Sequence, residues 1–540
     1  MRTGLLALLV CTVSAAASAQ SNTIAGLDAE MNRIGNLTTK GRKGTFPHGT
    51  SGVSFDTNIC NTGSVAIEWK VAMDPRHPII AFMLARELNG RLEQISDRSD
   101  VKHTFFATNA SDCSFCTDAS DPTVLAIGCS DTYGNDENGD RYWLAPAAEI
   151  DPWLVAWDPV CSHFDQGEPA VAPPANCDGL RSLSTSMASA LNPVGHRVNI
   201  TDQEFQVPGT WYYQGYYVIN GEPEDVRENN WGTRTFTPSW SGTKWNLTSP
   251  TGFVNGSILT RWSGAVVTSA KNGNDDGRLY VGVKVTGPVA GLYHYEYALQ
   301  NRDNFRGAGD VSIPICSGAR ILNLGFSDVD DNAANDWIAA VNSTSIDFDA
   351  NGNPVRWNSF YNFWFDSDAA PMAGSINVDE HDAGAGLASL DITTGVPTGL
   401  FNVYLGDGCS LGGGFPSLYA NGQATLGNPS FAIGSSGNQP GQVHILVAGA
   451  IDGSVALPAG CTQWFAGTFG AGAFVFQTGI TDGSGVVTYA APIPADPSYE
   501  GMAANLQAAS LNPGGGPIAG LFDLTNGLKV RIGNSIPGCP

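Results

Sequence analysis

Short runs rich in aromatic and β-branched residues recur along the whole chain, several of them with alternating apolar and polar positions. These runs predict β-strands at Trp211–Val218, Arg278–Val285 and Gln442–Val447, because successive side chains of a strand point to opposite faces. Gly, Pro, Asn and Asp separate the runs at short intervals, as turns require. The pattern predicts a mainly β protein with several β-sandwich domains in tandem and few short helices.

Two segments depart from this pattern. The apolar run from Pro78 to Arg91 fits either a buried strand pair or a short helix, and its length does not decide between them. Leu183, Met187 and Leu191 lie four residues apart, so the segment from Ser182 to Leu191 is a modest helix candidate.

Changes in composition suggest the domain boundaries. Breaks are expected near Asn272–Gly277 and Gly384–Gly399, and the Pro-rich stretch Gly167–Asn176 is expected to be an exposed connection inside the first unit. The predicted parts are a leader (1–19), an N-terminal cysteine-containing β-rich domain (20–270), a β-sandwich (271–385) and a Gly-rich C-terminal β-sandwich module (400–540).

The first residues have the features of a secretory signal peptide. Met1-Arg2 is positive, Leu5–Val13 is apolar, and Ala17-Ser18-Ala19 is a small-residue cleavage site. The apolar run is shorter than the ~20 residues that cross a bilayer, and no later run reaches that length. We therefore expect a protein that is secreted or held at the cell surface, or that stays in the periplasm, with no transmembrane segment after cleavage.

The charge balance narrows the choice of partners. The formal net charge is -24, and no basic cluster is present. Nucleic acids and anionic membranes are excluded as partners, because both are bound through Lys and Arg.

Ten short motifs of the chain carry a resemblance to known proteins. Those in the tail are Leu405-Gly-Asp-Gly-Cys409, Phe415-Pro-Ser-Leu418, Leu426-Gly-Asn-Pro-Ser-Phe431, Leu457-Pro-Ala-Gly-Cys461 and Ile493-Pro-Ala-Asp-Pro497. Those upstream are His77-Pro-Ile-Ile80, Gly90-Arg-Leu-Glu-Gln-Ile95, Lys102-His-Thr-Phe-Phe106, Gly128-Cys-Ser-Asp-Thr-Tyr133 and Tyr293-His-Tyr-Glu-Tyr-Ala-Leu-Gln-Asn301. The tail resembles the C-terminal β-sandwich module common on exported proteins of planctomycete-type bacteria, and the upstream part resembles a family of secreted proteins from the same bacteria that has no assigned activity. The resemblance implies export and a sandwich architecture, and it implies no chemistry.

Chemistry-bearing residues are densest between Lys102 and Tyr133. In an exported chain the default state of Cys113, Cys116 and Cys129 is a disulfide, either local or to Cys60. Zinc held by these three thiolates and His103 is the weaker alternative, because the spacing does not match a standard zinc module. Cys409 and Cys461 are expected to pair with each other, since both lie in the tail.

The same stretch contains the candidates for catalysis. His77 or His103 would act as a general base, Asp131 would orient it, and Ser130 or Tyr133 would supply a hydroxyl. Ser130 lacks the Gly-x-Ser-x-Gly context of a nucleophile elbow, so this assignment is weak.

A second candidate site is a calcium loop. Asp328, Asp330, Asn332 and Asp336 place hard oxygen ligands at short intervals. The loop lacks the Gly and Glu of a complete EF-hand, and a solvated Asp/Asn turn explains the same residues.

Two functions remain open at this point. The favoured one is a non-catalytic protein with a binding, adhesion or scaffolding role, whose partners would be carbohydrate or cell-surface components. Tryptophans able to stack on sugar rings are Trp231, Trp240, Trp245 and Trp262. The alternative is a secreted hydrolase or metal-dependent enzyme with its site around His103 and Asp131; burial of these groups would favour the scaffold, and an open pocket the enzyme.

Overall fold

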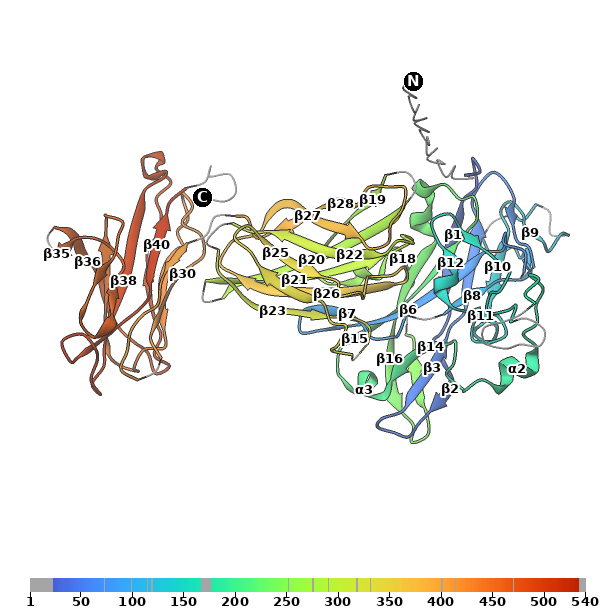
Figure 1. Ribbon diagram of the computed structural model, residues 1–540, viewed down its shortest axis with the longest axis horizontal. Helices are drawn as coiled ribbons and strands as arrows, with labels where there is room; N and C mark the ends of the chain where they lie inside the picture. The colour runs from blue at the N-terminus through green and yellow to red at the C-terminus, as the bar shows by residue number, and fades with distance from the viewer. Residues whose placement is uncertain are drawn as a thin grey trace, which may run out of the picture.

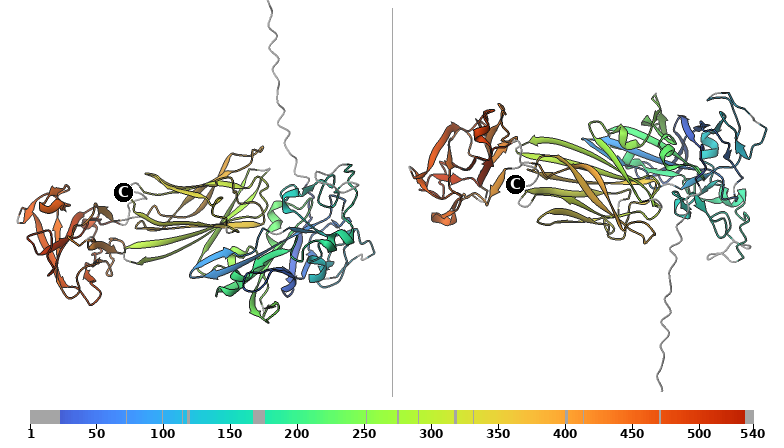
Figure 2. Two further views of the ribbon diagram at one scale, coloured as in Figure 1. Left: turned by 60° about the horizontal axis from the view of Figure 1, so that its bottom comes forward. Right: turned by 90° about the horizontal axis from the view of Figure 1, so that it is seen from above.

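The computed structural model describes residues 23–533 except 72, 99, 114, 118–119, 167–175, 251, 274–275, 290, 317–318, 331, 400–401, 413 and 470. The expected leader and nearly all of the Pro-rich stretch lie outside these residues. The fold is mainly β, and its three parts lie in a row (Figures 1 and 2). We refer to them as the N-terminal unit (23–262), the middle sandwich (266–396) and the C-terminal module (402–533).

The N-terminal unit is organised around one large sheet. Its strand order is β11 (Leu144–Ala145), β8 (Val101–His103), β6 (Ile79–Leu88), β15 (Thr210–Val218), β16 (Trp231–Trp240) and β17 (Trp245–Thr248), with β7 (Arg91–Gln94) on β6 and β18 (Val254–Asn255) on β16. Smaller sheets join β1 (Ala29–Ile34), β4 (Thr57–Asn61) and β10 (Ser130–Tyr133); β14 (Val198–Thr201), β3 (Thr50–Ser54) and β2 (Thr38–Lys43); β5 (Ile67–Glu68) and β9 (Val124–Leu125); and β12 (Ile150–Asp151) and β13 (Ala156–Trp157). The short helices are α1 (Asn135–Asn138), α2 (Thr185–Ala190) and α3 (Asp202–Gln206), with 3-10 turns that include η2 (Glu224–Asn229) and η3 (Ile258–Arg261).

Strand β6 settles the ambiguous run from Pro78 to Arg91. Ile80, Phe82 and Leu84 face one hydrophobic core of the unit. The alternate residues, such as Ala81 and Met83, face a second core. Because both faces are buried, the strand is apolar from Ile79 to Ala85 and shows no alternation there.

The middle part is a sandwich of two five-stranded antiparallel sheets around its own core. One sheet has the order β19 (Val266–Asn272), β20 (Asp276–Val289), β21 (Leu292–Asn301), β26 (Ser359–Ser367) and β23 (Ile321–Ser327). The other has the order β24 (Ile338–Val341), β25 (Ser345–Asp349), β22 (Ala308–Pro314), β27 (Met372–Glu380) and β28 (Ser389–Val396). Strand β19 begins at Val266, before the expected start of this domain at residue 271, and β28 ends at Val396, after its expected end at residue 385. This pair of sheets therefore extends beyond the expected domain at both ends.

The C-terminal module is a second sandwich with unequal sheets. The larger has the order β29 (Val403–Leu405), β40 (Gly527–Arg531), β38 (Ala503–Leu511), β32 (Val443–Gly449), β36 (Gly472–Ile480) and β35 (Thr468–Phe469), with β39 (Phe522–Leu524) on β38. The smaller joins β30 (Ser417–Asn421), β31 (Ala432–Ser436) and β37 (Val487–Ala490), and β33 (Val455–Ala456) pairs with β34 (Thr462–Gln463).

The N-terminal unit and the middle sandwich share a continuous core. Tyr280, Ala298, Trp357 and Phe360 of the sandwich pack into the hydrophobic cluster that contains Met83 of β6. The indole of Trp357 also donates a 2.9 Å hydrogen bond to the carbonyl of Ala147. The two parts are therefore packed as one body.

A buried ionic network lies beside this shared core. Arg302 and Asp303, at the end of β21, have side chains with no exposed surface. Arg302 donates to Glu228 at 2.6 Å and to Glu224 at 3.0 Å, and both carboxylates belong to η2 of the N-terminal unit. Asp303 in turn accepts a 3.1 Å hydrogen bond from Arg227 of the same turn. Arg302 and Asp303 also pair with each other at 3.1 Å, and the residues of η2 complete the pairing of these buried charges across the joint.

We predict that Arg302→Met lowers the free energy of unfolding by about 3 kcal/mol, because it leaves the buried carboxylate of Asp303 and the largely buried one of Glu224 without one cationic partner. The matched control is Lys529→Met, which removes a cation from the exposed pair with Asp452 and should have a much smaller effect. Urea denaturation of both variants measures the difference. Equal effects of the two substitutions would show that the network does not hold the joint.

Candidate functional site

The two histidines singled out by the sequence are in direct contact. His103 lies on β8 and His77 just before β6, and these neighbouring strands bring His77 Nε2 within 2.7 Å of His103 Nδ1. His77 Nδ1 lies 2.5 Å from the carbonyl oxygen of Asp74. Since a carbonyl can only accept, His77 carries its proton on Nδ1 and its Nε2 accepts from His103. The remaining His103 Nε2 is then a bare lone pair, and it has no partner among the described residues.

The histidine pair is closed off from solvent. His77 and His103 are both buried, and the rings of Trp157 and Phe164 lie against His103 at 4.8 Å between centroids. Burial disfavours the charged imidazolium, so it lowers the pKa of His77 to about 4 and that of His103 well below its usual range. Both imidazoles are therefore neutral near pH 7 and enclosed by the protein in this structure.

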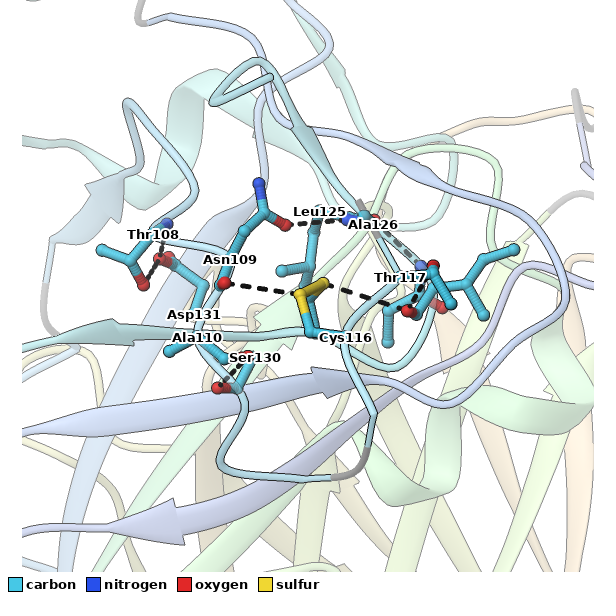
Figure 3. The surroundings of a disulfide bond; sticks show 12 residues. Thr108, Asn109, Ala110, Cys116, Thr117, Leu125, Ala126, Ser130 and Asp131 are labelled. Carbon is cyan, nitrogen blue, oxygen red and sulfur yellow. Dashed lines mark hydrogen bonds between the residues drawn. A yellow bond between two sulfur atoms is a disulfide. The ribbon is translucent and has the colours of Figure 1, made fainter. Parts of the chain in front are cut away.

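Asp131 does not orient either histidine. Its Oδ1 accepts from the backbone N–H of Thr108 at 2.7 Å and from the Thr108 hydroxyl at 2.8 Å (Figure 3). Burial raises the pKa of Asp131 to about 6, against these hydrogen bonds, which lower it. The expected partners of a triad are therefore not assembled around this carboxyl group.

The two candidate hydroxyls are also engaged elsewhere. The Ser130 hydroxyl donates to the carbonyl of Ala110 at 3.1 Å. Tyr133 Oη accepts from the Trp69 indole at 3.1 Å and from the Phe105 amide at 2.9 Å, and donates to the carbonyl of Phe106. In this structure the base, the orienting acid and the hydroxyls do not form a triad, and a catalytic role of these residues stays a prediction.

The three thiols of the stretch are disulfide-bonded. Cys113 is joined to Cys60 and Cys116 to Cys129, so the local Cys113–Cys116 bridge is not formed. A thiol in a disulfide is not a thiolate ligand, so the alternative zinc set of three cysteines and His103 is not available. Further bridges join Cys161 to Cys177 and Cys409 to Cys461, the tail pair singled out in the sequence.

Asn109 organises the loop around the Cys116–Cys129 bridge. Its carbonyl oxygen lies 3.4 Å from Cys116 Sγ, and its side-chain oxygen accepts from the Ala126 amide at 2.9 Å (Figure 3). Its amide group donates to the carbonyls of Asp121 and Val124. The Cys116–Cys129 disulfide thus closes a loop in which the Asn109 side chain already satisfies three backbone polar groups.

Lys102 is the residue of this region that the sequence reasoning missed. Its side chain is buried, and its Nζ lies 4.7 Å from the ring centre of Phe105 and 5.3 Å from those of Tyr133 and Trp143. Burial lowers the pKa of Lys102 well below its usual range. The signal available in the sequence was a lysine three residues before a Phe-Phe pair, which does not distinguish an aromatic enclosure from a surface lysine.

The carboxylates of the expected calcium loop turn back on the loop itself. Asp328 accepts from the Asp330 amide at 2.9 Å and from the Asn353 side chain at 2.6 Å, and Asp330 accepts from the Asn332 amide at 2.7 Å. Asp336 is exposed. Within the described ranges no group of three His, Cys, Asp or Glu side chains is placed to hold a metal ion.

Two of these loop residues do line a polar groove of about 310 Å³ between the N-terminal unit and the middle sandwich. Asp328 and Asp330 form one side of it, and Glu93, Asp97 and Glu204 lie on the other. His77, His103 and Asp131 do not line this groove.

Most of the tryptophans considered for sugar contact fill cores. Trp231, Trp245 and Trp262 are buried. Trp240 is partly exposed, and Phe46 stacks on it at 4.5 Å while Arg42 lies 4.7 Å from its ring centre. Carbohydrate contact stays a prediction, and among these four tryptophans it rests on Trp240.

The burial of the histidines predicts their reactivity toward diethylpyrocarbonate. In the native protein His48 and His381, which are exposed, should be modified readily, whereas His77 and His103 should be protected until the chain unfolds. Peptide mass spectrometry after brief labelling reads all four in one sample. Rapid native labelling of His77 or His103 would support an open catalytic site.

The raised pKa of Asp131 predicts that this residue lowers the stability of the folded protein as the pH rises. Its folded value of about 6 exceeds the unfolded value of 3.8, so this group's contribution to stability is complete below about pH 4 and is lost as the pH rises through 6. Asp131→Asn removes this loss, and the stability of the variant relative to the parent should rise by about 2 to 3 kcal/mol between pH 4 and pH 8. Urea denaturation across that range tests the sign, and a relative stability that falls with pH would contradict it.

Comparisons with known proteins assign no family to the chain. No family model matches it, and no curated protein matches it. Among solved structures, the major pilin subunit of Bacillus cereus and a variant of that subunit each share 10% sequence identity, with 64% of this chain and 88% of that chain covered. The TM-score of 0.18 in both cases is too low to carry an argument about fold or function.

Proposed function

We propose that this protein is a secreted or surface-held, non-catalytic scaffold with a binding or adhesion role. The observation that carries the proposal is the enclosure of His77, His103 and Asp131 in a core pinned by disulfides. Disulfides persist in oxidising compartments, so they support an extracellular location. In the part of the chain that the structure describes, no helix has the length and apolarity that a membrane crossing requires.

The mechanical basis of the proposed role is the joint between the N-terminal unit and the middle sandwich. A hydrophobic cluster crosses it, and so do the ion pairs of Arg302 and Arg227. Arg91 of β7 adds a two-point contact to Glu296 of β21, at 2.8 and 2.6 Å, and lies over the ring of Trp364. Such a joint transmits force and fixes orientation, which is what a spacer or scaffold needs.

The disulfide-pinned loop supplies a surface suited to contact with a partner. Phe115 lies between Cys113 and Cys116, and each of these cysteines is bonded to a different part of the unit. Its side chain is 84% exposed. An aromatic side chain held out on a braced loop loses little entropy when a partner buries it, as binding hot spots require.

Distance measurements between the two parts test the scaffold proposal. Spin labels carried by noncanonical residues at the exposed positions Leu180, in the N-terminal unit, and Leu387, in the middle sandwich, report their separation. We expect one narrow distance distribution, as narrow as that of a control pair within the N-terminal unit at Leu180 and Val254. A broad or two-peaked distribution for the first pair alone would show a hinge and would contradict a rigid scaffold.

A further inference from the structure

The outer edge of β36 in the C-terminal module is open. On one side β36 pairs with β32 from Ala473 to Ile480. On the other side β35 pairs only with Gly472 and Ala473. No strand of the described chain pairs with this edge from Phe474 to Ile480, so its backbone groups are available to another strand.

This edge is apolar and contains neither a charged residue nor a proline. Phe474, Val475, Phe476 and Ile480 are 55%, 48%, 41% and 69% exposed. Residues 461–481 include no Asp, Glu, Lys, Arg or Pro, the residues with which proteins normally prevent edge pairing. A register shift opposite Leu446 and Val447 leaves Phe476 as an extra residue of β36 that pairs with no residue of β32.

An apolar pocket of about 410 Å³ lies directly beside the edge. Phe474 and Phe476 form one wall, and Phe431, Ile493 and Met502 are among the residues that line the rest. The pocket is present because the three-stranded sheet covers only part of the larger sheet. A strand added to β36 would bring its own apolar side chains to this pocket.

The position and charge of the edge indicate its occupant. Figures 1 and 2 show β36 at the free end of the molecule, away from the middle sandwich and the N-terminal unit. Residues 402–540 contain six Asp or Glu and two Lys or Arg, so this module carries -4 of the chain's -24. Two copies that meet at this end therefore avoid both steric overlap and most of the mutual repulsion of their acidic bodies.

We propose that β36 is a self-association edge, at which two copies pair antiparallel about a twofold axis to form a continuous sheet. Antiparallel pairing lets the same residues of both copies contact one another, which is the self-complementarity that a twofold interface requires. The exposed phenylalanines of each copy then cover the pocket mouth of the other. The result is an end-to-end dimer with the two N-terminal units at opposite ends.

The test is sedimentation equilibrium of the full mature chain from about 1 to about 100 µM, a range that covers weak and moderate dimers. The parent should approach twice the monomer mass. Val475→Lys, which places a charge on the edge, should raise the dimer dissociation constant at least tenfold. The matched control is Leu411→Lys, which places the same charge on another exposed apolar residue of the module and should leave the constant unchanged.

Hydrogen exchange of the amides of residues 474–480 gives a second readout that does not depend on a variant. Their exchange should slow as the parent protein is concentrated, while that of the Val475→Lys variant should not. A parent that stays monomeric throughout, or a Val475→Lys variant that dimerises like the parent, would overturn the proposal. A monomeric parent whose β36 amides become protected only when a foreign peptide is added would also overturn it, in favour of a different occupant.

Discussion

The pairing of buried arginines with buried carboxylates between the N-terminal unit and the middle sandwich is the constraint on which the rest of the structure depends. Asp303 and Arg302 have no exposed side-chain surface; they pair with each other and with residues of the turn η2 on the other side of the joint. Burial opposes ionisation of Glu224, but its hydrogen bonds to Arg278 and Arg302 and their charges outweigh this effect and lower its pKa to about 2. Separating buried ions from their partners has a large free-energy cost, so these pairs favour the closed joint. The shared hydrophobic core packs beside them.

This constraint also bears on function. Enzymes often place their sites in clefts between domains, where the two walls can move. Here aromatic side chains and ion pairs fill the centre of the interface, and the polar groove at its border is not lined by His77, His103 or Asp131. The histidines lie on β8 and next to β6, in the interior. The loop with Phe115 and the open edge of β36 are exposed at opposite ends of the molecule. The arrangement suits contacts at the ends of a stiff body better than chemistry within it.

Local features of the fold could be predicted from the sequence, and long-range ones could not. The strands at Trp211–Val218 and Gln442–Val447 and the helix within Ser182–Leu191 follow from residue type and period, and β15, β32 and α2 lie there. Helix α2 begins where Ser184 accepts from the Met187 amide, an ordinary N-cap. The run at β6 stayed ambiguous because a strand between two cores has no polar face.

The candidate site also has local features that the sequence predicts and long-range contacts that it does not predict. That His77, His103 and Asp131 belong to one region is readable from the sequence, but the contact between the histidines depends on the pairing of β6 with β8. The disulfide partners depend on the placement of β4 beside β10, which carries Cys60 toward Cys113 and leaves Cys116 to Cys129. The aromatic surroundings of Lys102 come from three separate segments. None of these contacts produces a periodic pattern in the sequence from which it could be predicted.

The central claim is that the region from Lys102 to Tyr133 is a disulfide-pinned structural core and not a metal or catalytic site. Peptide mapping of the mature protein by mass spectrometry without reduction, combined with metal analysis of the same sample, tests it most directly. The account predicts linked peptides for Cys60–Cys113 and Cys116–Cys129 and no bound zinc. Free thiols at Cys113, Cys116 and Cys129 together with one zinc ion per chain would contradict it.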